Sequence, residues 1–128
     1  MRSVLAACLC LMLPAPALAE FSFTFQWGAI PLCTSGNPNR VGNPQFVLSD
    51  VPEGTTVVEF RLKDLDVPGY NHGGGKVRLT TSGTVPMGVF KYKSPCPPNG
   101  SHTYEWTAKA RAGGKVLATA KARRKYPE

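Results

Sequence analysis

A chain of 128 residues with a formal net charge of +7 has the length of one small domain with a modest core. Its 12 prolines and 13 glycines are too frequent for long helices. The positive charge indicates attraction to acidic partners such as phospholipid headgroups or small anions, whereas the scattered placement of the basic residues argues against nucleic acid as a partner.

The first 19 residues predict a cleavable export signal. Arg2 supplies a positive start, residues 4–13 are apolar, and Ala17-Leu18-Ala19 has the small-x-small pattern of a cleavage site. A membrane-spanning helix needs about 20 apolar residues, so the short run favours a signal peptide over a transmembrane anchor. We therefore expect a signal peptide at 1–19, a single mature domain at 20–128, and a periplasmic or secreted location.

Removal of this leader changes the cysteine count. Cys8 and Cys10 leave with it, Cys33 and Cys96 remain, and loss of Arg2 lowers the formal charge from +7 to +6. In an oxidising compartment a lone cysteine pair is most simply a disulfide, which would stabilise the fold by roughly 4 kcal/mol. A metal-binding pair is the alternative, but it lacks a CxxC spacing and nearby histidines at both ends.

The mature region alternates apolar and polar residues with a period of two, which predicts strands. Residues 21–27 form the first, with the phenylalanines and Trp27 on one face. The segment 31–44, rich in Pro, Gly, Asn and Ser, predicts a loop, and a short strand follows at 45–48.

A second clear strand is predicted at 57–64, with Val58, Phe60 and Leu62 facing inward. The segments after it are a loop at 67–75, a strand at 76–81, turns at 82–88 and an irregular proline-rich stretch at 92–100.

The last two strands form a predicted hairpin. Residues 103–111 alternate with Tyr104, Trp106, Ala108 and Ala110 inward, and Gly113-Gly114 predicts a tight turn. Residues 115–123 return with Val116, Ala118, Ala120 and Ala122 on one face. The predicted fold class is all-β, a mainly antiparallel β sandwich or compact sheet domain.

Two of the inward faces run into an ionisable residue at a strand end. The parity of Phe60 and Leu62 continues to Asp64, and that of Trp106 and Tyr104 extends back to His102. A carboxylate on an apolar face needs partners. Either Asp64, His102 and Tyr104 meet in a pocket, or Asp64 caps a turn and His102 is exposed at the strand start.

The same residues carry a resemblance to a known family. Asp64-Leu65-Asp66-Val67-Pro68 resembles the Asp-x-Asp-x-Pro motif of the phosphatidylethanolamine-binding proteins, whose bacterial members are often called Raf-kinase-inhibitor-like. The proline-rich stretch 92–98, followed by His102-Thr103-Tyr104, resembles the second signature of that family. Asn43-Pro44 precedes both in the expected order, so the resemblance spans about residues 43–110.

This resemblance implies a β-rich fold around a pocket for phosphate-like headgroups. The implied ligand-binding residues are Asp64, Asp66 and Pro68 on one wall, Pro97 and Pro98 in the loop, and His102 and Tyr104 on the other wall. An imidazole and a phenol can donate hydrogen bonds to a phosphate oxygen, and an aspartate can orient the histidine from behind. We expect a small anionic ligand or phospholipid headgroup, no cofactor, and no catalysis.

The chain departs from the family pattern at several points. Leu65 stands where the family usually has proline, and Asn71-His72 followed by three glycines replaces a segment containing His and Trp. His72 is a candidate second pocket histidine. The C-terminal tail that can cover the pocket in the family is lacking from this sequence, so we expect a more open pocket.

Other interpretations of these residues stay open. His72-Gly73-Gly74-Gly75 is either a phosphate-cradling loop, helped by Lys76, or a turn that needs glycine. A zinc site from the two histidines with Asp64 and Asp66 uses acceptable ligand types but has no supporting spacing. Hydrolysis lacks a Gly-x-Ser-x-Gly motif around Ser94 or Ser101.

The basic segment 121–125 has two explanations. It is a solvated strand edge that discourages pairing with other chains, or it is a membrane-surface contact. The second explanation belongs to an alternative function, a structural or protein- and membrane-interaction domain with a vestigial pocket.

Overall fold

The structure, a computed structural model, describes residues 9–13, 19–34 and 36–128. The described part contains strands and no helix, which confirms the all-β prediction, and accordingly no long apolar helix that could cross a membrane is found there. The strands are β1 (Ser22–Phe25), β2 (Arg40–Gly42), β3 (Phe46–Ser49), β4 (Val57–Asp64), β5 (Gly74–Arg78), β6 (Gly83–Val85), β7 (Lys91–Lys93), β8 (His102–Ala112) and β9 (Lys115–Tyr126).

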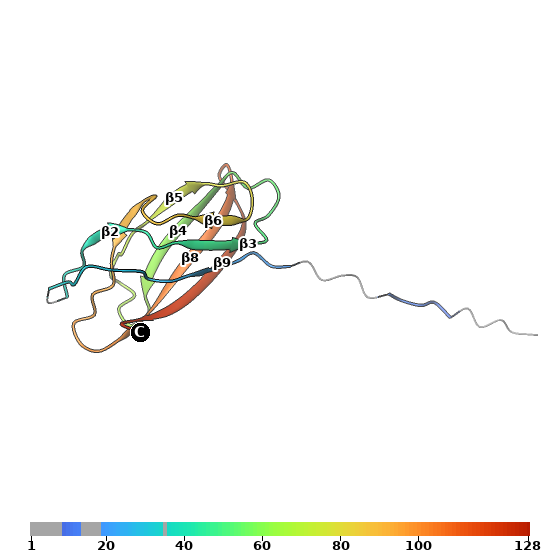
Figure 1. Ribbon diagram of the computed structural model, residues 1–128. Helices are drawn as coiled ribbons and strands as arrows, with labels where there is room; N and C mark the ends of the chain where they lie inside the picture. The colour runs from blue at the N-terminus through green and yellow to red at the C-terminus, as the bar shows by residue number, and fades with distance from the viewer. Residues whose placement is uncertain (1–8, 14–18, 35) are drawn as a thin grey trace, which may run out of the picture.

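Two antiparallel sheets form the body of the domain. The larger has the order β5-β4-β8-β9 and the smaller has the order β1-β3-β6. In Figure 1 the smaller sheet lies across the face of the larger one, as in a β sandwich. A third sheet consists of β2 and β7, and β7 lies next to β5 of the larger sheet.

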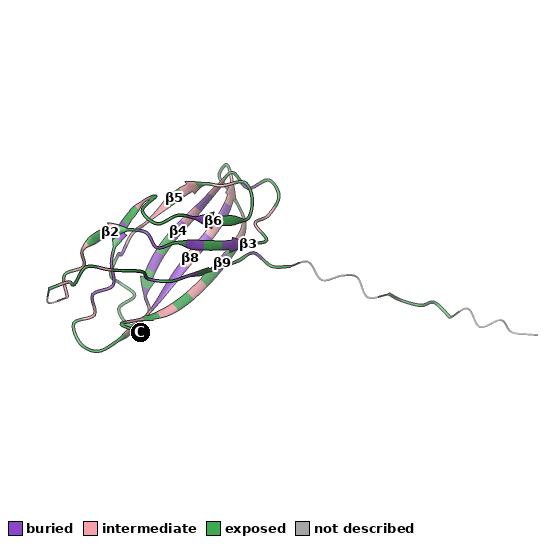
Figure 2. Cartoon of the chain, viewed as in Figure 1, coloured by how far each residue is buried: buried purple, intermediate pink, exposed green. Residues whose placement is uncertain are grey.

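Aromatic side chains fill the space between the two layers. Phe46 of β3 stacks on Phe60 of β4 with ring centroids 4.3 Å apart, and Trp106 of β8 meets Phe46 edge-on at 5.2 Å. Such pairs contribute about 0.5–1.5 kcal/mol each beyond the burial of their area. Figure 2 shows the buried residues alternating along the strands that face this core, as a period of two requires.

The long strands agree with the sequence prediction, with one exception. β4 covers 57–64 as predicted, and Gly113 adopts φ +59° in the hairpin turn. The exception is Val116, predicted to lie on the same face as Ala118 but largely exposed. Ala110 pairs with Ala118, whereas Arg111 pairs with Val116, so a bulge reverses the alternation between them.

Three short strands were predicted as loops or turns. β2, β6 and β7 have three residues each and lie in the segments predicted as the 31–44 loop, the 82–88 turns and the start of the proline-rich stretch. Three residues are too few to display a period, and the neighbouring prolines and glycines dominate the local signal.

The predicted disulfide is present. Cys33 and Cys96 are bonded, with Cα atoms 6.0 Å apart across a sequence separation of 63. The predicted leader lies mostly outside the described residues. Within it, Leu9, Leu11, Met12 and Leu13 are exposed and belong to no strand or helix.

The basic segment 121–125 lies inside β9, which continues to Tyr126. The Arg123 guanidinium bonds the carboxylate of Glu105 at 2.7 Å, and Arg124 donates to the carbonyl of Phe25. This arrangement supports the strand-edge explanation, because these arginines already have partners on the protein.

Candidate functional site

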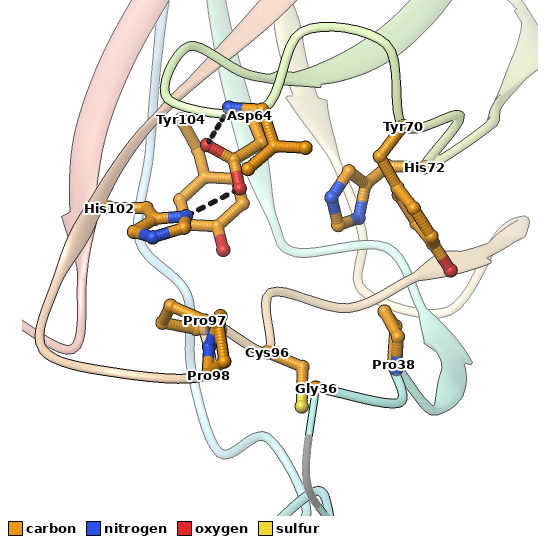
Figure 3. Close-up of a pocket in the computed structure, with 11 residues that line it drawn as sticks. Gly36, Pro38, Asp64, Tyr70, His72, Cys96, Pro97, Pro98, His102 and Tyr104 are labelled. Carbon is orange, nitrogen blue, oxygen red and sulfur yellow. Dashed lines mark hydrogen bonds and ion pairs between the residues drawn. The ribbon is translucent and has the colours of Figure 1, made fainter.

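A cavity of about 200 Å³ opens where β4 ends and β8 begins (Figure 3). Pockets for drug-sized ligands occupy about 300–1,000 Å³, so this volume suits a small headgroup or anion. The lining residues come from four segments: Gly36 and Pro38; Asp64, Val67, Tyr70 and His72; Cys96, Pro97 and Pro98; His102 and Tyr104.

Asp64 organises this end of the sheet through three hydrogen bonds. Its Oδ1 accepts from the backbone N–H groups of Asp66 at 2.9 Å and Val67 at 3.2 Å, which shapes the turn after β4. Its Oδ2 lies 2.7 Å from Nδ1 of His102. The Asp64 side chain is only 6% exposed, and these three donors compensate for the burial of its charge.

His102 is thereby held in one orientation. A carboxylate only accepts, so Nδ1 carries the proton, and Nε2 is left as an acceptor when the ring is neutral and a donor when it is charged. The side chain is 16% exposed and can be reached by a ligand. The two interpretations left open by the sequence both hold in part: Asp64 shapes a turn, and it also meets His102 at the pocket.

Tyr104 stands beside this pair. It is opposite Asp64 in the β4–β8 register, and its ring lies 6.3 Å from that of His102. In Figure 3 its hydroxyl points toward the proline loop. Burial, reinforced by the nearby Asp64 carboxylate, raises the pKa of Tyr104 well above its ordinary value, so the phenol stays protonated and able to donate.

His72 forms the opposite side of the cavity. Its Nδ1 lies 2.7 Å from the carbonyl oxygen of Lys93, so Nδ1 donates and Nε2 is the acceptor in the neutral ring. Burial lowers the pKa of His72 below 6.5, against an opposing effect of the Lys93 carbonyl. Its ring meets those of Tyr70 at 4.6 Å and Tyr104 at 5.6 Å.

The structure brings together six of the eight predicted ligand-binding residues. They are Asp64, His72, Pro97, Pro98, His102 and Tyr104. The other two, Asp66 and Pro68, are exposed and lie outside the lining of the cavity. Asp66 accepts a hydrogen bond from the backbone N–H of Thr103 at 2.8 Å, which ties the turn after β4 to the start of β8.

Several lining residues carried no signal in the sequence. Tyr70 and Val67 belong to a segment predicted only as a loop, although an aromatic two residues before a candidate pocket histidine was an available hint. Gly36 and Pro38 follow Cys33, and the disulfide places that loop beside Cys96 in the wall.

The triple glycine after His72 has a structural explanation. Gly73 adopts φ +77°, a Cβ on Gly74 would overlap the carbonyl of Phe60, and a Cβ on Gly75 would overlap the ring of Phe90. Lys76 is paired with Glu59 at 3.8 Å. The glycines are therefore required by a tight backbone path alongside β4.

Asp64, Asp66 and His102 place one potential metal-ligand atom each within 4.8 Å of one another. Oδ2 of Asp64 is hydrogen-bonded to Nδ1 of His102, and Oδ2 of Asp66 accepts a hydrogen bond from the backbone N–H of Thr103. A metal held by these same atoms would have to break these bonds. The cluster is accounted for as a hydrogen-bonded unit.

Comparison with known proteins identifies the fold. No family model matches the chain, and no curated protein matches its sequence. A crystal structure from Chlamydia trachomatis, of a protein provisionally described as a phosphatidylethanolamine-binding protein homologue, superimposes with a TM-score of 0.58. The match has 19% identity and covers 85% of this chain and 98% of the other. The fold is phosphatidylethanolamine-binding-protein-like. This confirms the predicted resemblance at the level of architecture.

Proposed function

We propose that this protein is a non-catalytic binding module for a small phosphate-bearing ligand, such as a phospholipid headgroup, and that it works outside the cytoplasm. The observation that carries the proposal is the Asp64–His102 hydrogen bond beside the protonated phenol of Tyr104, in a cavity of headgroup size.

The donors of the pocket suit an anion. When the His102 ring is protonated, its Nε2–H donates to a phosphate oxygen while its Nδ1–H stays bonded to Asp64, and the Tyr104 hydroxyl is a second donor. The Asp64 oxygens are already engaged by three protein donors, which reduces their repulsion of a bound anion.

The cavity lining supports binding rather than turnover. Among the described residues that line the cavity, Cys96 is bonded in a disulfide and is therefore not a free nucleophile. The raised pKa of Tyr104 disfavours the phenolate, which is the nucleophilic form of this side chain.

The extracytoplasmic location is supported by the Cys33–Cys96 disulfide and by the exposed apolar residues near the N-terminus. A disulfide is rare in reducing compartments, and the predicted cleavable leader supplies the route out.

Titration of residues 20–128 with inorganic phosphate, followed by ¹⁵N NMR of the histidine side chains, tests the proposal. We expect the signals of His102 and His72, which both line the cavity, to shift at millimolar phosphate. Loss of the His72 response in His102→Ala, with the dispersed spectrum of a folded domain retained, would support the pocket. A spectrum that does not respond to phosphate in the wild-type protein would refute it.

A further inference from the structure

A second hollow lies on the other side of His72. It has a volume of about 250 Å³ and is lined by Arg40, Asn71, His72, Gly73, Gly74, Lys91, Tyr92 and Lys93. His72 lines both hollows, so the two lie next to each other at this residue. We call this second hollow the cationic groove, after its residues Arg40, Lys91 and Lys93.

The strand pairing concentrates these three positive charges. Arg40 of β2 is directly opposite Lys93 of β7 in the register. Alternation along β7 puts Lys91 and Lys93 on one face, while Tyr92 between them turns inward and is 3% exposed. Like charges directly opposite one another on a sheet are destabilising, so this arrangement needs a compensating anion.

The protein itself supplies no such anion. Every Asp and Glu of the chain is among the described residues, and none forms an ion pair with Arg40, Lys91 or Lys93. In contrast, Glu59 and Glu105 each hold two basic side chains elsewhere on the larger sheet. The three basic side chains of the groove are therefore available to pair with an anion from outside the protein.

The groove is preformed. The backbone N–H of Lys93 donates to the carbonyl of His72 at 2.8 Å, and the His72 ring donates back to the carbonyl of Lys93. The backbone N–H of Ser94 donates to the carbonyl of Asn39, and the backbone N–H of Asn39 donates to the hydroxyl oxygen of Ser94. These bonds fix the backbone at the end of β7 to His72 and Asn39, so the backbone that carries the three basic residues is held in place.

The groove also leads to the mouth of the first pocket. The Lys93 ammonium lies 5.5 Å from the ring centroid of Tyr70, which lines that pocket. One side of His72 therefore offers the phosphate donors His102 and Tyr104, and the other offers a cluster of cations.

We propose that the cationic groove is a second anion subsite, and that the ligand of this protein carries two anionic groups, one for each side of His72. The inference rests on the proposed function of the first pocket and deepens it, because it names the ligand class. A zwitterionic headgroup such as phosphoethanolamine would place an ammonium near Arg40, Lys91 and Lys93, and should bind more weakly than a bis-anion.

The test compares probes with one and two phosphates on residues 20–128. The probes are inorganic phosphate, hexyl phosphate, phosphoethanolamine and a series of α,ω-alkanediol bisphosphates with increasing linker length. Tethering converts the second contact into an intramolecular one, so we expect the best bisphosphate to bind at least tenfold more tightly than hexyl phosphate. We expect phosphoethanolamine to show no gain over hexyl phosphate.

Charge variants locate that gain. Arg40→Gln/Lys91→Gln/Lys93→Gln should abolish the gain while inorganic phosphate still shifts the His102 signals. A matched control that removes the same charge far from the groove, Arg78→Gln/Lys109→Gln/Lys115→Gln, should keep it. If the triple groove variant does not fold, Lys91→Gln alone replaces it in the test. Lys91 lies opposite Gly42 in the register, and its replacement should lower the affinity for the best bisphosphate at least threefold.

The outcomes separate the two proposals. If no bisphosphate binds more than twofold more tightly than hexyl phosphate, or if the gain in affinity survives in the groove variant, the second subsite is refuted. The proposal for the first pocket is not affected by either result. An equal loss in groove and control variants means general attraction and also overturns it. A wild-type His102 signal that ignores every probe overturns the pocket itself.

Discussion

Replacing Asp64 with asparagine should change both the stability of the domain and the state of His102. Asparagine keeps the Oδ1 acceptor for the two backbone N–H groups but puts an NH₂ where Oδ2 now accepts from Nδ1. A charge-assisted hydrogen bond contributes about 1.5–3 kcal/mol and a neutral one about 1 kcal/mol. We therefore expect a loss of about 1–2 kcal/mol in the free energy of unfolding.

The histidine must respond to the new donor. With NH₂ opposite Nδ1, the neutral ring is expected to move its proton to Nε2, and the imidazolium loses its counter-charge. A difference of about 1.4 kcal/mol corresponds to tenfold in affinity. The neutral Nε2–H can still donate to phosphate, but it is a weaker donor than a charged ring, so we expect phosphate to bind about tenfold more weakly to Asp64→Asn.

Urea unfolding, ¹⁵N shifts of the two ring nitrogens and a phosphate titration measure these three effects. Asp66→Asn is the matched control, because Asp66 contacts the backbone of Thr103 and lies outside the cavity lining. It should keep the His102 tautomer and the phosphate affinity. The reasoning fails if Asp64→Asn leaves His102 protonated on Nδ1 and binds phosphate as tightly as the wild type.

Three other predictions concern stability. Replacing Cys33 and Cys96 with alanine opens a loop of 63-residue separation and should lower the free energy of unfolding by about 4 kcal/mol; a loss below 1 kcal/mol in urea unfolding would contradict this. The pKa of His72 is about 6.5 in the unfolded chain and lower in the folded chain. The unfolded state therefore binds more protons as the pH falls. Stability should therefore be full above pH 6.5 and decline toward pH 5, and His72→Gln should flatten that slope; an unchanged slope argues against it. Gly74→Ala should cost more than 3 kcal/mol or prevent folding, because its Cβ meets the Phe60 carbonyl, whereas Gly69→Ala, with open space around it, should be close to neutral in thermal unfolding.

The sequence predicted most of what depends on local periodicity. The inward parity of Phe60 and Leu62 led to Asp64, and that of Trp106 led back to His102, so two strand ends pointed to one site before any fold was known. The parity of Val116 failed because a bulge is a property of the pairing between two strands, and neither strand shows it alone.

The parts that could not be predicted depend on contacts distant in sequence. Lys93 joins Arg40 because two three-residue strands pair with each other, and neither strand indicates this pairing by its own sequence. Short strands gain their stability from neighbours rather than from their own pattern, so the cationic groove was absent from the sequence prediction.

Under the proposed function, the disulfide makes ligand binding depend on oxidation of the chain. Its two cysteines lie in the segments that supply Gly36 and Pro38 on one side and Pro97 and Pro98 on the other. Without the bond these two walls have no covalent link, although both large sheets can still form from hydrogen bonds and aromatic packing. A chain that has not been oxidised should therefore be a folded domain with an incomplete pocket. Affinity for the ligand would then be acquired at oxidation, which keeps newly made chains from occupying ligand before they reach an oxidising compartment.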